Sequence, residues 1–369
     1  MKIALFYHLP VSGAKRVVFE QTKWLKKSGH TIDIYTLEHA DTFFNPDLFA
    51  QNTYVYRYTP KLVSFPFIKR LSQDLNDFFV LQNLHKKIAK DIDSRNYDIA
   101  LIHTDALTQA PFVLRFLKTK NVYFCLEPLR IVYEYGLRIP ETFPFVNKLY
   151  ESINRIIRKK IDRENARASD YSLAISFFGR ELMIEAFDLY PKISYPGIDT
   201  IIFKKLPVKK KNQILFIGQK LSINGYHYAQ QALEYIPRNI RPELKIISWT
   251  KNKKERLSDN DLVKLYNESI LTLSLSNFDT VGLVPLESLA CETPVIAFHV
   301  AGYRETMHDK QTGYLVDFNA KEIAEKIITL LKNPGLAEHM GKQGKAWIEK
   351  QWTWEKQIKN LENILKNIV

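Results

Sequence analysis

An acidic residue on an otherwise apolar helix face is the strongest chemical signal in this sequence of 369 residues. A strand is predicted to end near Ser276, and a helix is predicted to begin at about Leu283 with Glu287 in its second turn. By i, i+3 and i+4 spacing, the apolar residues on this face are Leu283, Leu286 and Ala290. A carboxylate in such surroundings is costly unless it has a partner. The hydroxyl groups of a ribose would provide one, and so would an arginine or lysine of the fold.

The segment just before this helix adds groups that suit phosphate and sugar. The first turn of a helix exposes unpaired N–H groups and the positive end of its dipole, which favours a diphosphate. Asp279 precedes that turn and has oxygen atoms that can accept hydrogen bonds from a sugar. The candidate residues for a nucleotide and its sugar are therefore Asp279, Thr280, Val281, Gly282, Leu283 and Glu287.

Alternating strands and helices are predicted along the whole chain and would position these groups. Residues 3–7 are continuously apolar, as in a parallel strand buried on both faces. Strict alternation favours a doubly wound parallel sheet. The predicted strands are 3–7, 31–37, 98–103, 121–125 and 171–175 in the first half, and 214–217, 244–248, 270–275, 294–298 and 313–316 in the second. The predicted helices include one that follows Gly13 and others at 68–92, 106–117, 144–167 and 353–369.

The length of the chain suits two such α/β domains. Two domains of this kind would leave a cleft between them. Ligands of open α/β sheets bind beyond the carboxyl ends of the strands, so the chemistry is expected in loops that face this cleft. The lysine-rich residues 204–211 are expected at the surface near the domain junction.

The segment with the two acidic residues resembles the retaining GT-B glycosyltransferases of family 4, whose hallmark is a Glu-x7-Glu motif. This chain has Asp279-x7-Glu287, with further matching residues at 282–283 and 293–297. The resemblance implies that Glu287 holds the ribose of a nucleotide and that Asp279 contacts the transferred sugar. Because aspartate is one methylene shorter than glutamate, the identity of that sugar is left open.

The resemblance extends in the same order over nearly the whole chain. Its further pieces are residues 12–18, like the N-terminal glycine-rich loop of the family, and residues 28–32, 195–199, 257–268, 301–305 and 312–316. It implies a GT-B fold, with two Rossmann-like doubly wound domains that face a central cleft. The expected boundaries are 1–196 for an acceptor-binding domain, 197–350 for a nucleotide-sugar-binding domain, and 351–369 for a C-terminal helix that packs back on the first domain.

The chain departs from the family pattern where a diphosphate would bind. The family has Gly-Arg near the first strand of the second domain and Lys-Gly a few residues later, and both cations neutralise the diphosphate. Here the aligned residues are Gly218-Gln219 and Asn224-Gly225, so both cations are missing. Lys220 lies one position along and would take over part of their role. Gln219 and Lys220 thus join the candidate nucleotide-binding residues.

The same resemblance assigns an acceptor side to the first half of the chain. Ser12 and Gly13 lie in the predicted glycine-rich loop, and Gly13 would also approach the donor. His103 aligns with the second histidine of a His-x-His in the family. It could equally be an ordinary strand-end histidine.

Two further acceptor-side candidates follow the predicted strand 121–125. Glu127 and Arg130 resemble residues of a family segment in which a histidine lies near the donor sugar. Leu126 replaces that histidine and cannot form its hydrogen bond. Glu127 and Arg130 could also simply pair with each other. The expected catalytic residues are Asp279, His103 and Glu127.

No metal ion or separate cofactor is expected. Asp91-x-Asp93 ends a predicted helix and Asp259-x-Asp261 begins one, so both are interpreted as surface capping residues. The resemblance implies that the departing diphosphate takes the acceptor proton without a metal. The donor would be a nucleoside diphosphate sugar of the UDP or GDP type. The sequence has no Gly-x-Gly-x-x-Gly motif and no phosphate-loop lysine, which argues against a dehydrogenase or an NTPase.

The composition gives a net charge of +13 and two cysteines, Cys125 and Cys291. The cysteines lie far apart, which excludes a disulfide scaffold and a cysteine-rich zinc site. The charge suits an anionic partner, such as a phosphorylated small molecule or an anionic lipid, and a soluble lysine-rich surface would have the same charge. A nucleic-acid partner is not expected, because no basic recognition motif accompanies the charge.

A cytoplasmic location is expected, because no stretch approaches the roughly 18 apolar residues of a membrane span. Residues 146–161 combine apolar positions with flanking arginines and lysines. Such a helix could lie on anionic lipid at the inner face of a membrane, or it could face the core with its basic side in water. The aromatic and basic residues 60–70 could form a lipid-facing loop of the acceptor domain.

These expectations describe a metal-independent hexosyltransferase that retains the anomeric configuration. It would move a sugar from a nucleotide sugar to a glycan or lipid-linked acceptor, in glycolipid, lipopolysaccharide or surface polysaccharide assembly. The alternative is a degenerate, non-catalytic subunit that binds nucleotide or glycan as the partner of an active enzyme. The missing phosphate cations and the leucine at position 126 favour that alternative.

Overall fold

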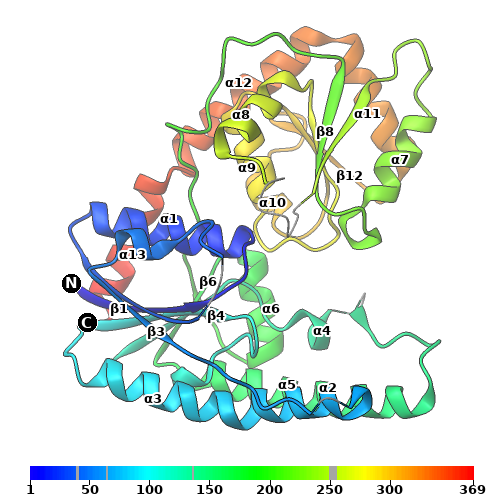
Figure 1. Cartoon of the computed structure of the whole chain (residues 1–369). Coiled ribbons are helices and arrows are strands. Elements are labelled where there is room, and N and C mark those ends of the chain that lie inside the picture. Colours follow the sequence, from blue (N-terminus) through cyan, green and yellow to red (C-terminus); the bar gives the residue numbers. More distant parts are fainter. Residues whose placement is uncertain (39–40, 64, 135–136, 249–255) are drawn as a thin grey trace. The chain divides into compact units, whose positions relative to one another are not determined.

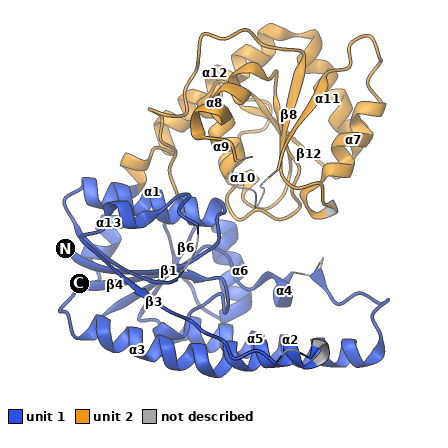
Figure 2. Cartoon of the chain, viewed as in Figure 1, with its two compact units in different colours: residues 1–194, 358–369 blue, residues 195–357 orange. Residues whose placement is uncertain are grey.

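The computed structural model describes residues 1–38, 41–63, 65–134, 137–248 and 256–369. Within these ranges the chain forms two compact units, which Figure 2 shows in blue and orange. The first unit contains residues 1–194 and 358–369, and the second contains residues 195–357. The divisions expected from the sequence follow residues 196 and 350. Each unit is built around its own parallel sheet, as the alternation of strands and helices predicts.

The sheet of the first unit has seven strands in the order β3-β2-β1-β4-β5-β6-β7. Its central strands β4 and β5 are buried along their whole length, as expected for parallel strands covered on both faces. The edge strands β3 and β7 were not predicted. The strands are β1 (Lys2–His8), β2 (Thr31–Leu37), β3 (Asn52–Tyr56), β4 (Ile99–Asp105), β5 (Asn121–Cys125), β6 (Tyr171–Ala174) and β7 (Lys192–Ile193).

Helices α1 and α13 cover one face of this sheet, and α3 and α5 cover the other (Figure 1). A π-helical turn, Asn76–Val80, joins α2 to α3 without a break, so the long helix predicted at 68–92 is confirmed. The helices are α1 (Gly13–Lys27), α2 (Pro66–Leu75), α3 (Leu81–Asp93), α4 (Arg130–Tyr133), α5 (Phe145–Arg167), α6 (Phe177–Phe187) and α13 (Trp354–Lys366).

The helix predicted at 106–117 is wrong. After β4 the chain turns sharply, and the backbone N–H groups of Asp105 and Gln109 each donate to the carbonyl oxygen of the other residue at 2.8 Å. Gln109 adopts the left-handed conformation, with a φ of 64°. Pro111 then biases the residue before it away from helical geometry. The helical structure in this described segment is a 3-10 turn, Phe112–Arg115.

The sheet of the second unit has five strands in the order β12-β11-β10-β8-β9, at the positions that the sequence predicts. Helices α7 and α11 pack on one face, and α8, α9 and α12 lie on the other (Figure 1). The strands are β8 (Gln213–Ile217), β9 (Glu243–Ile247), β10 (Thr272–Ser274), β11 (Val295–Phe298) and β12 (Gly313–Val316). The helices are α7 (Tyr226–Glu234), α8 (Asp259–Glu268), α9 (Leu283–Ala290), α10 (Tyr303–Thr306), α11 (Ala320–Lys332) and α12 (Pro334–Gln351).

The end of the chain returns to the first unit through α13. Its residues Ile358, Leu361 and Leu365 are buried at helical spacing. Glu362 Oε1 lies 2.9 Å from His30 Nε2, and Lys120 Nζ donates to the carbonyl oxygen of Ile368 at 2.8 Å. The predicted C-terminal helix and its return to the N-terminal domain are therefore confirmed.

Candidate functional site

The predicted nucleotide residues meet where the strand order of the second sheet reverses. β8 pairs with β9 on one side and with β10 on the other, so the connections after β8 and β10 leave the sheet in different directions. Ligands of doubly wound sheets bind at such a switch point, beyond the carboxyl ends of the strands. Gln219 and Lys220 follow β8, whereas Asp279 and Glu287 follow β10. The fold thus brings these two predicted groups to one edge of one sheet.

Asp279 organises the loop that leads from β10 into α9. Its Oδ1 accepts hydrogen bonds from the backbone N–H groups of Val281, at 3.3 Å, and Gly282, at 2.8 Å. The Tyr303 hydroxyl donates to Oδ2 at 3.4 Å. The side chain therefore holds its own loop, beside the first turn of α9 where a diphosphate is expected.

Two glycines make this loop sterically possible. Gly282 has a φ of 81°, which favours glycine, and a Cβ there would lie 2.8 Å from the Tyr303 ring. A Cβ on Gly302 would lie 2.5 Å from the Val281 Cα and 2.6 Å from the Thr280 carbonyl oxygen. The loop after β11 is thus pressed against backbone atoms of the predicted donor site.

Glu287 is in the second turn of α9, as predicted, and only 5% of its surface is exposed. The Tyr266 hydroxyl, which is fully buried on α8, donates to Glu287 Oε2 at 2.8 Å. Leu286 and Ala290 are buried beside it, as the helical spacing predicts. A phenol is a neutral hydrogen-bond donor, so this contact orients one carboxylate oxygen of Glu287 without adding a charge of its own.

The loop after β8 packs against the end of β10. Gly225 has a φ of 71°, and a Cβ there would lie 2.0 Å from the Leu275 carbonyl oxygen. The backbone N–H of Asn277 donates to the Ile223 carbonyl oxygen at 3.3 Å. Lys220 is exposed on this loop, with its Nζ 5.9 Å from the centre of the Tyr226 ring. A cation is therefore available on the loop where the family pattern has its own.

The first unit has its own switch point, between β1 and β4. Ser12 caps α1: its hydroxyl oxygen accepts from the backbone N–H of Lys15 at 3.3 Å and donates to the Pro10 carbonyl oxygen at 3.1 Å. Gly13 is the first residue of the helix. The predicted acceptor residues Ser12 and Gly13 thus lie beyond the carboxyl end of β1.

A histidine–aspartate pair that was not predicted spans this switch point. His8, the last residue of β1, places Nδ1 2.9 Å from Oδ1 of Asp105, the last residue of β4. Asp105 is fully buried and also accepts from the Leu107 N–H and the Thr108 hydroxyl, both at 2.9 Å. Burial alone would raise the pKa of Asp105, but the hydrogen bond and charge of His8 lower it overall. The ionised carboxylate fixes Nδ1 of the partly exposed His8, which leaves Nε2 as the atom for a ligand.

His103, the predicted catalytic histidine, is fully buried within β4. Its ring lies 5.1 Å from the ring of Phe124, and neither ring nitrogen has a hydrogen-bond partner among the described residues. Burial lowers the pKa of His103 to about 3, so the ring is neutral. The structure therefore supports the ordinary buried histidine rather than an acceptor ligand at this position.

Glu127 and Arg130 lie after β5, as predicted. The backbone carbonyl oxygen of Glu127 accepts from Gln109 Nε2 at 3.1 Å, which joins the loops after β4 and β5. Arg130 Nε donates to Glu134 Oε2 at 2.7 Å, within the region of α4. The side chain of Arg130 is thus oriented by Glu134, and Leu126 beside this loop is buried.

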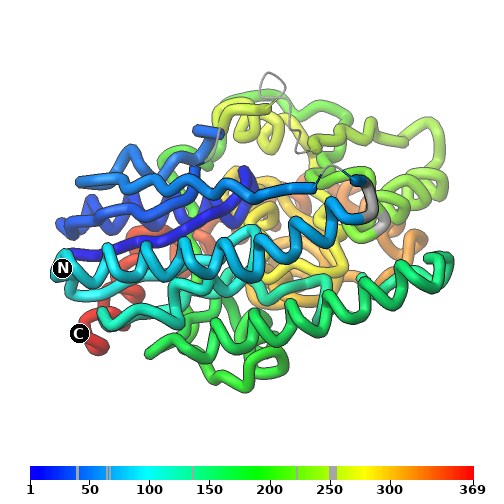
Figure 3. Tube along the Cα trace, turned by 60° about the horizontal axis from the view of Figure 1, so that its bottom comes forward, coloured from blue at the N-terminus to red at the C-terminus, as the bar shows by residue number. Residues whose placement is uncertain are grey.

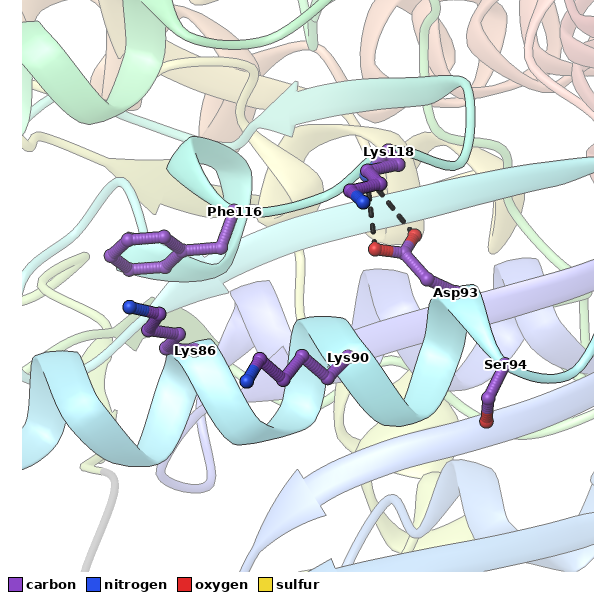
Figure 4. A pocket seen from close by; sticks show the side chains of 6 residues that line it. All are labelled: Lys86, Lys90, Asp93, Ser94, Phe116 and Lys118. Atoms are coloured by element: carbon purple, nitrogen blue, oxygen red, sulfur yellow. Dashed lines mark hydrogen bonds between the residues drawn. The ribbon is translucent and has the colours of Figure 1, made fainter.

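A pocket of about 510 Å³ in the first unit lies away from these loops. Figure 4 shows its side chains, with Asp93 accepting two hydrogen bonds from the backbone N–H of Lys118 at 3.0 and 3.1 Å. It lies between the end of α3 and the segment before β5, at the amino ends of the strands. Its position is therefore opposite to the edge where doubly wound sheets bind ligands. The lining residues are Lys86, Lys90, Asp93, Ser94, Phe116 and Lys118.

Asp261, in the first turn of α8, has a structural role. Ser258 and Asp261 form a capping box, in which each side chain bonds the backbone N–H of the other residue at 3.2 Å. Asp261 is therefore a capping residue, as predicted. Within the part of the chain that the structure describes, no group of three or more histidine, cysteine, aspartate and glutamate residues could hold a metal ion.

Two family models match this chain. The model described as Glycosyltransferase Family 4 matches residues 11–201, which is more than half of the chain. The chain belongs to glycosyltransferase family 4. A second model, described as Glycosyl transferases group 1, matches residues 252–347 and so includes the Asp279-x7-Glu287 motif of this family 4 glycosyltransferase. The family predicted from the sequence is confirmed.

Two relatives of this family 4 glycosyltransferase match about a quarter to a third of the chain. N-acetyl-alpha-D-glucosaminyl L-malate synthase of Bacillus anthracis is 32% identical over 111 residues, which are 30% of this chain and 29% of the relative. GDP-mannose-dependent monoacylated alpha-(1-6)-phosphatidylinositol monomannoside mannosyltransferase of Corynebacterium glutamicum is 38% identical over 88 residues, 24% of this chain and 23% of the relative. The chain thus spans less than a third of the length of these curated relatives in the matches.

The solved structure of Anabaena Alr3699/HepE in complex with UDP is similar over the whole chain. The TM-score is 0.72 at 15% sequence identity, and the match covers 100% of both chains. A likeness at this identity shows the fold, which is GT-B in this family 4 glycosyltransferase.

Proposed function

We propose that this protein is a metal-independent hexosyltransferase that moves a sugar from a nucleoside diphosphate sugar to a hydroxyl acceptor with retention of configuration. The observation that carries the proposal is the nearly buried carboxylate of Glu287, held by Tyr266 one turn inside α9, at the switch point of the second sheet. The similar HepE structure holds UDP, and the name of the corynebacterial relative describes a GDP-mannose-dependent enzyme, which together support a uridine or guanosine diphosphate donor.

Different residues of the second unit bind different parts of the nucleotide sugar. Glu287 accepts hydrogen bonds from the ribose hydroxyls, and the first turn of α9 receives the diphosphate. Lys220 supplies charge near the phosphates, in place of the two cations that the family pattern has at Gln219 and Asn224. The Asp279 side chain holds the N–H groups of Val281 and Gly282 in position and so fixes the loop before α9. Asp279 also contacts the transferred sugar.

The acceptor residues come from the first unit: Ser12, Gly13, Glu127 and Arg130, with His8 in place of His103. His8 Nε2 binds the acceptor hydroxyl while Asp105 orients the ring. In the reaction, the bond from the anomeric carbon to the diphosphate oxygen breaks and a bond to the acceptor oxygen forms on the same face. The departing diphosphate takes the acceptor proton, so the protein contributes orientation and stabilisation of the leaving charge.

The acceptor that we propose is a glycan or a lipid-linked glycan at the cytoplasmic face of a membrane, in glycolipid, lipopolysaccharide or surface polysaccharide assembly. The name of the corynebacterial relative describes an enzyme that acts on a glycosylated phosphatidylinositol. This supports a lipid-linked acceptor without naming the one used here.

The proposal is tested by nucleotide release. Purified protein is incubated with UDP- and GDP-sugars, each alone and with a lipid-linked glycan extract, and free nucleoside diphosphate is measured over time. We expect release that depends on the acceptor, because hydrolysis is suppressed in a water-excluding site, and a product with the anomeric configuration of the donor by NMR. Nucleotide binding without release, with every donor and acceptor, would instead support the degenerate binding subunit.

A further inference from the structure

Helices α2 and α5 of the first unit are joined through polar side chains. Asp74 on α2 accepts hydrogen bonds from Asn154 Nδ2 at 2.6 Å and from Arg158 at 2.5 Å, and also from the Tyr150 hydroxyl. Arg158 donates to Asp77 as well, at 3.3 Å. Asp74, Asp77 and Asn154 are buried. Figure 3 shows the two helices running alongside each other, and these contacts form the seam between them.

The apolar side chains of the same helices point outward. On α5, five apolar residues at helical spacing are each at least half exposed: Phe145, Val146, Leu149, Ile153 and Ile156. On α2 and the turn after it, apolar residues that recur every three or four positions are also exposed: Phe65, Ile68, Leu71, Leu75 and Phe79. Of the two alternatives left open for residues 146–161, the core-facing one does not hold for this stripe.

This arrangement is the reverse of an ordinary helix pair at a protein surface. Such helices normally bury their apolar stripe and expose their polar side. Here the charged side chains are buried in the seam, and the apolar stripes of two adjacent helices are in water. A large exposed apolar surface of this kind indicates a binding partner or a membrane.

The charged residues around these two apolar stripes indicate which kind of partner the surface binds. In the described residues of 61–80 and 141–164, the exposed acidic residues are Glu141 and Glu164, and Glu164 pairs with Arg115 at 3.1 Å. The other acidic residues of these segments are buried. The exposed basic residues are Lys61, Lys69, Arg70, Lys159 and Lys160. An apolar stripe with basic flanks is complementary to an anionic bilayer, whereas a second copy of this face would bring like charges together.

We propose that this surface, which we call the α2–α5 face, docks on anionic lipid with its apolar stripes in the headgroup region and its lysines against the lipid phosphates. None of the helices in the described residues is long and apolar enough to cross a bilayer, so the contact is peripheral. Taken with the proposed function, on which this last step rests, the face identifies the acceptor as lipid-linked.

Vesicle flotation tests the docking without any enzymatic readout. The full chain is mixed with vesicles of phosphatidylcholine alone or with phosphatidylglycerol, at low and high salt. We expect binding to the anionic vesicles that weakens at high salt, since surface charge interactions are screened. Equal binding to neutral vesicles, or no binding at all, would overturn the proposal.

A matched pair of double variants locates the contact. Phe145 and Ile156 are 78% and 68% exposed on the α2–α5 face, and Tyr190 and Ile201 are 76% and 71% exposed elsewhere. We expect Phe145→Ser with Ile156→Ser to weaken vesicle binding by roughly tenfold or more, because the inserted apolar area is lost. Tyr190→Ser with Ile201→Ser should bind like the native chain, and equal losses in both pairs would contradict the assignment.

Two further readouts separate the docking from the proposed reaction. Release of nucleotide with a water-soluble acceptor should be the same in both double variants and in the native chain. Vesicle binding without any transfer would leave the docking surface standing and remove the proposed function. Transfer without vesicle binding would leave the proposed function standing and remove the docking surface. A change of oligomeric state in the Phe145 and Ile156 variant alone would show that a second copy covers this face.

Discussion

Two histidines near the carboxyl end of β4 have opposite environments. His8 is partly exposed and held by Asp105, whereas the ring of His103 is fully buried and makes no hydrogen bond in the described structure. The sequence favours His103 because it aligns with a family histidine. The preference for His8 over His103 could not be predicted from the local sequence pattern. The contact of His8 with Asp105 joins residues 97 positions apart through the pairing of β1 with β4.

The two histidines can be separated by one pair of variants. We expect His8→Ala to lower the rate of transfer by roughly tenfold, since a hydrogen bond to the acceptor is lost, with nucleotide affinity unchanged. We expect His103→Leu to retain transfer, because an apolar side chain of similar volume suits the site. Initial rates and calorimetric titration with nucleotide distinguish these results. Loss of transfer in His103→Leu at full thermal stability would restore the predicted role.

The stability of His103→Leu should also differ from that of the native chain at acidic pH. Burial lowers the pKa of His103 to about 3 and that of His85 to about 4. In the unfolded chain these two histidines bind protons near pH 6.5, whereas in the folded chain they stay neutral until the pH is much lower. The free energy of unfolding therefore falls as the pH is lowered from about 6.5 towards these pKa values. In His103→Leu this fall should be smaller, as measured by denaturant unfolding at pH 7 and pH 5.

At the scale of elements, the donor site is a set of loops that fit one another closely. Gly302 lies against the backbone of Thr280 and Val281, and Asp279 bonds the N–H groups that precede α9. The sequence predicts β10 and α9 well, because an apolar strand, a loop and an apolar helix follow one another. The approach of the loop after β11 is a tertiary contact that no local pattern contains.

Gly302→Ala tests this close fit. The new Cβ would lie 2.5 Å from a backbone atom, so the loop that contains Asp279 must shift. We expect the variant to lose about 1–3 kcal/mol of stability, as overpacking does, and to bind nucleotide several-fold more weakly. Gly335→Ala is the control, because nothing lies within 4 Å of a Cβ there. Thermal unfolding with and without nucleotide measures both effects, and identical behaviour of the two variants would contradict the account.

Other elements show where local pattern stops being informative. β3 is an edge strand with partly exposed residues, so it lacks the continuous apolar run of the central strands. The segment 106–117 has helical composition, but the turn between Asp105 and Gln109 prevents the helix. In α5 the periodicity is helical, but the side that faces out depends on tertiary contacts such as the polar seam with α2, which no local pattern contains.

At the scale of the whole molecule, two doubly wound units carry separate sets of groups. The order of strands and helices makes the two sheets predictable from the sequence, and the two family models match residues 11–201 and 252–347. The donor candidates lie at the strand-order reversal of the second sheet, and the acceptor candidates lie after β1, at the reversal of the first sheet, and after the neighbouring strand β5. The proposed sugar transfer depends on the second unit, because a nucleotide sugar must bind there before its sugar can be transferred.

The most direct measurement is isothermal titration of UDP and GDP into the native chain, Glu287→Ala and Glu325→Ala. Glu325 is an exposed glutamate on α11 of the same unit and serves as the matched control. We predict that the native chain and Glu325→Ala bind one of the nucleotides equally. Glu287→Ala should bind it roughly 10- to 100-fold more weakly, since hydrogen bonds to a charged group contribute about 1.5–3 kcal/mol. An affinity of Glu287→Ala equal to that of the native chain would contradict the account.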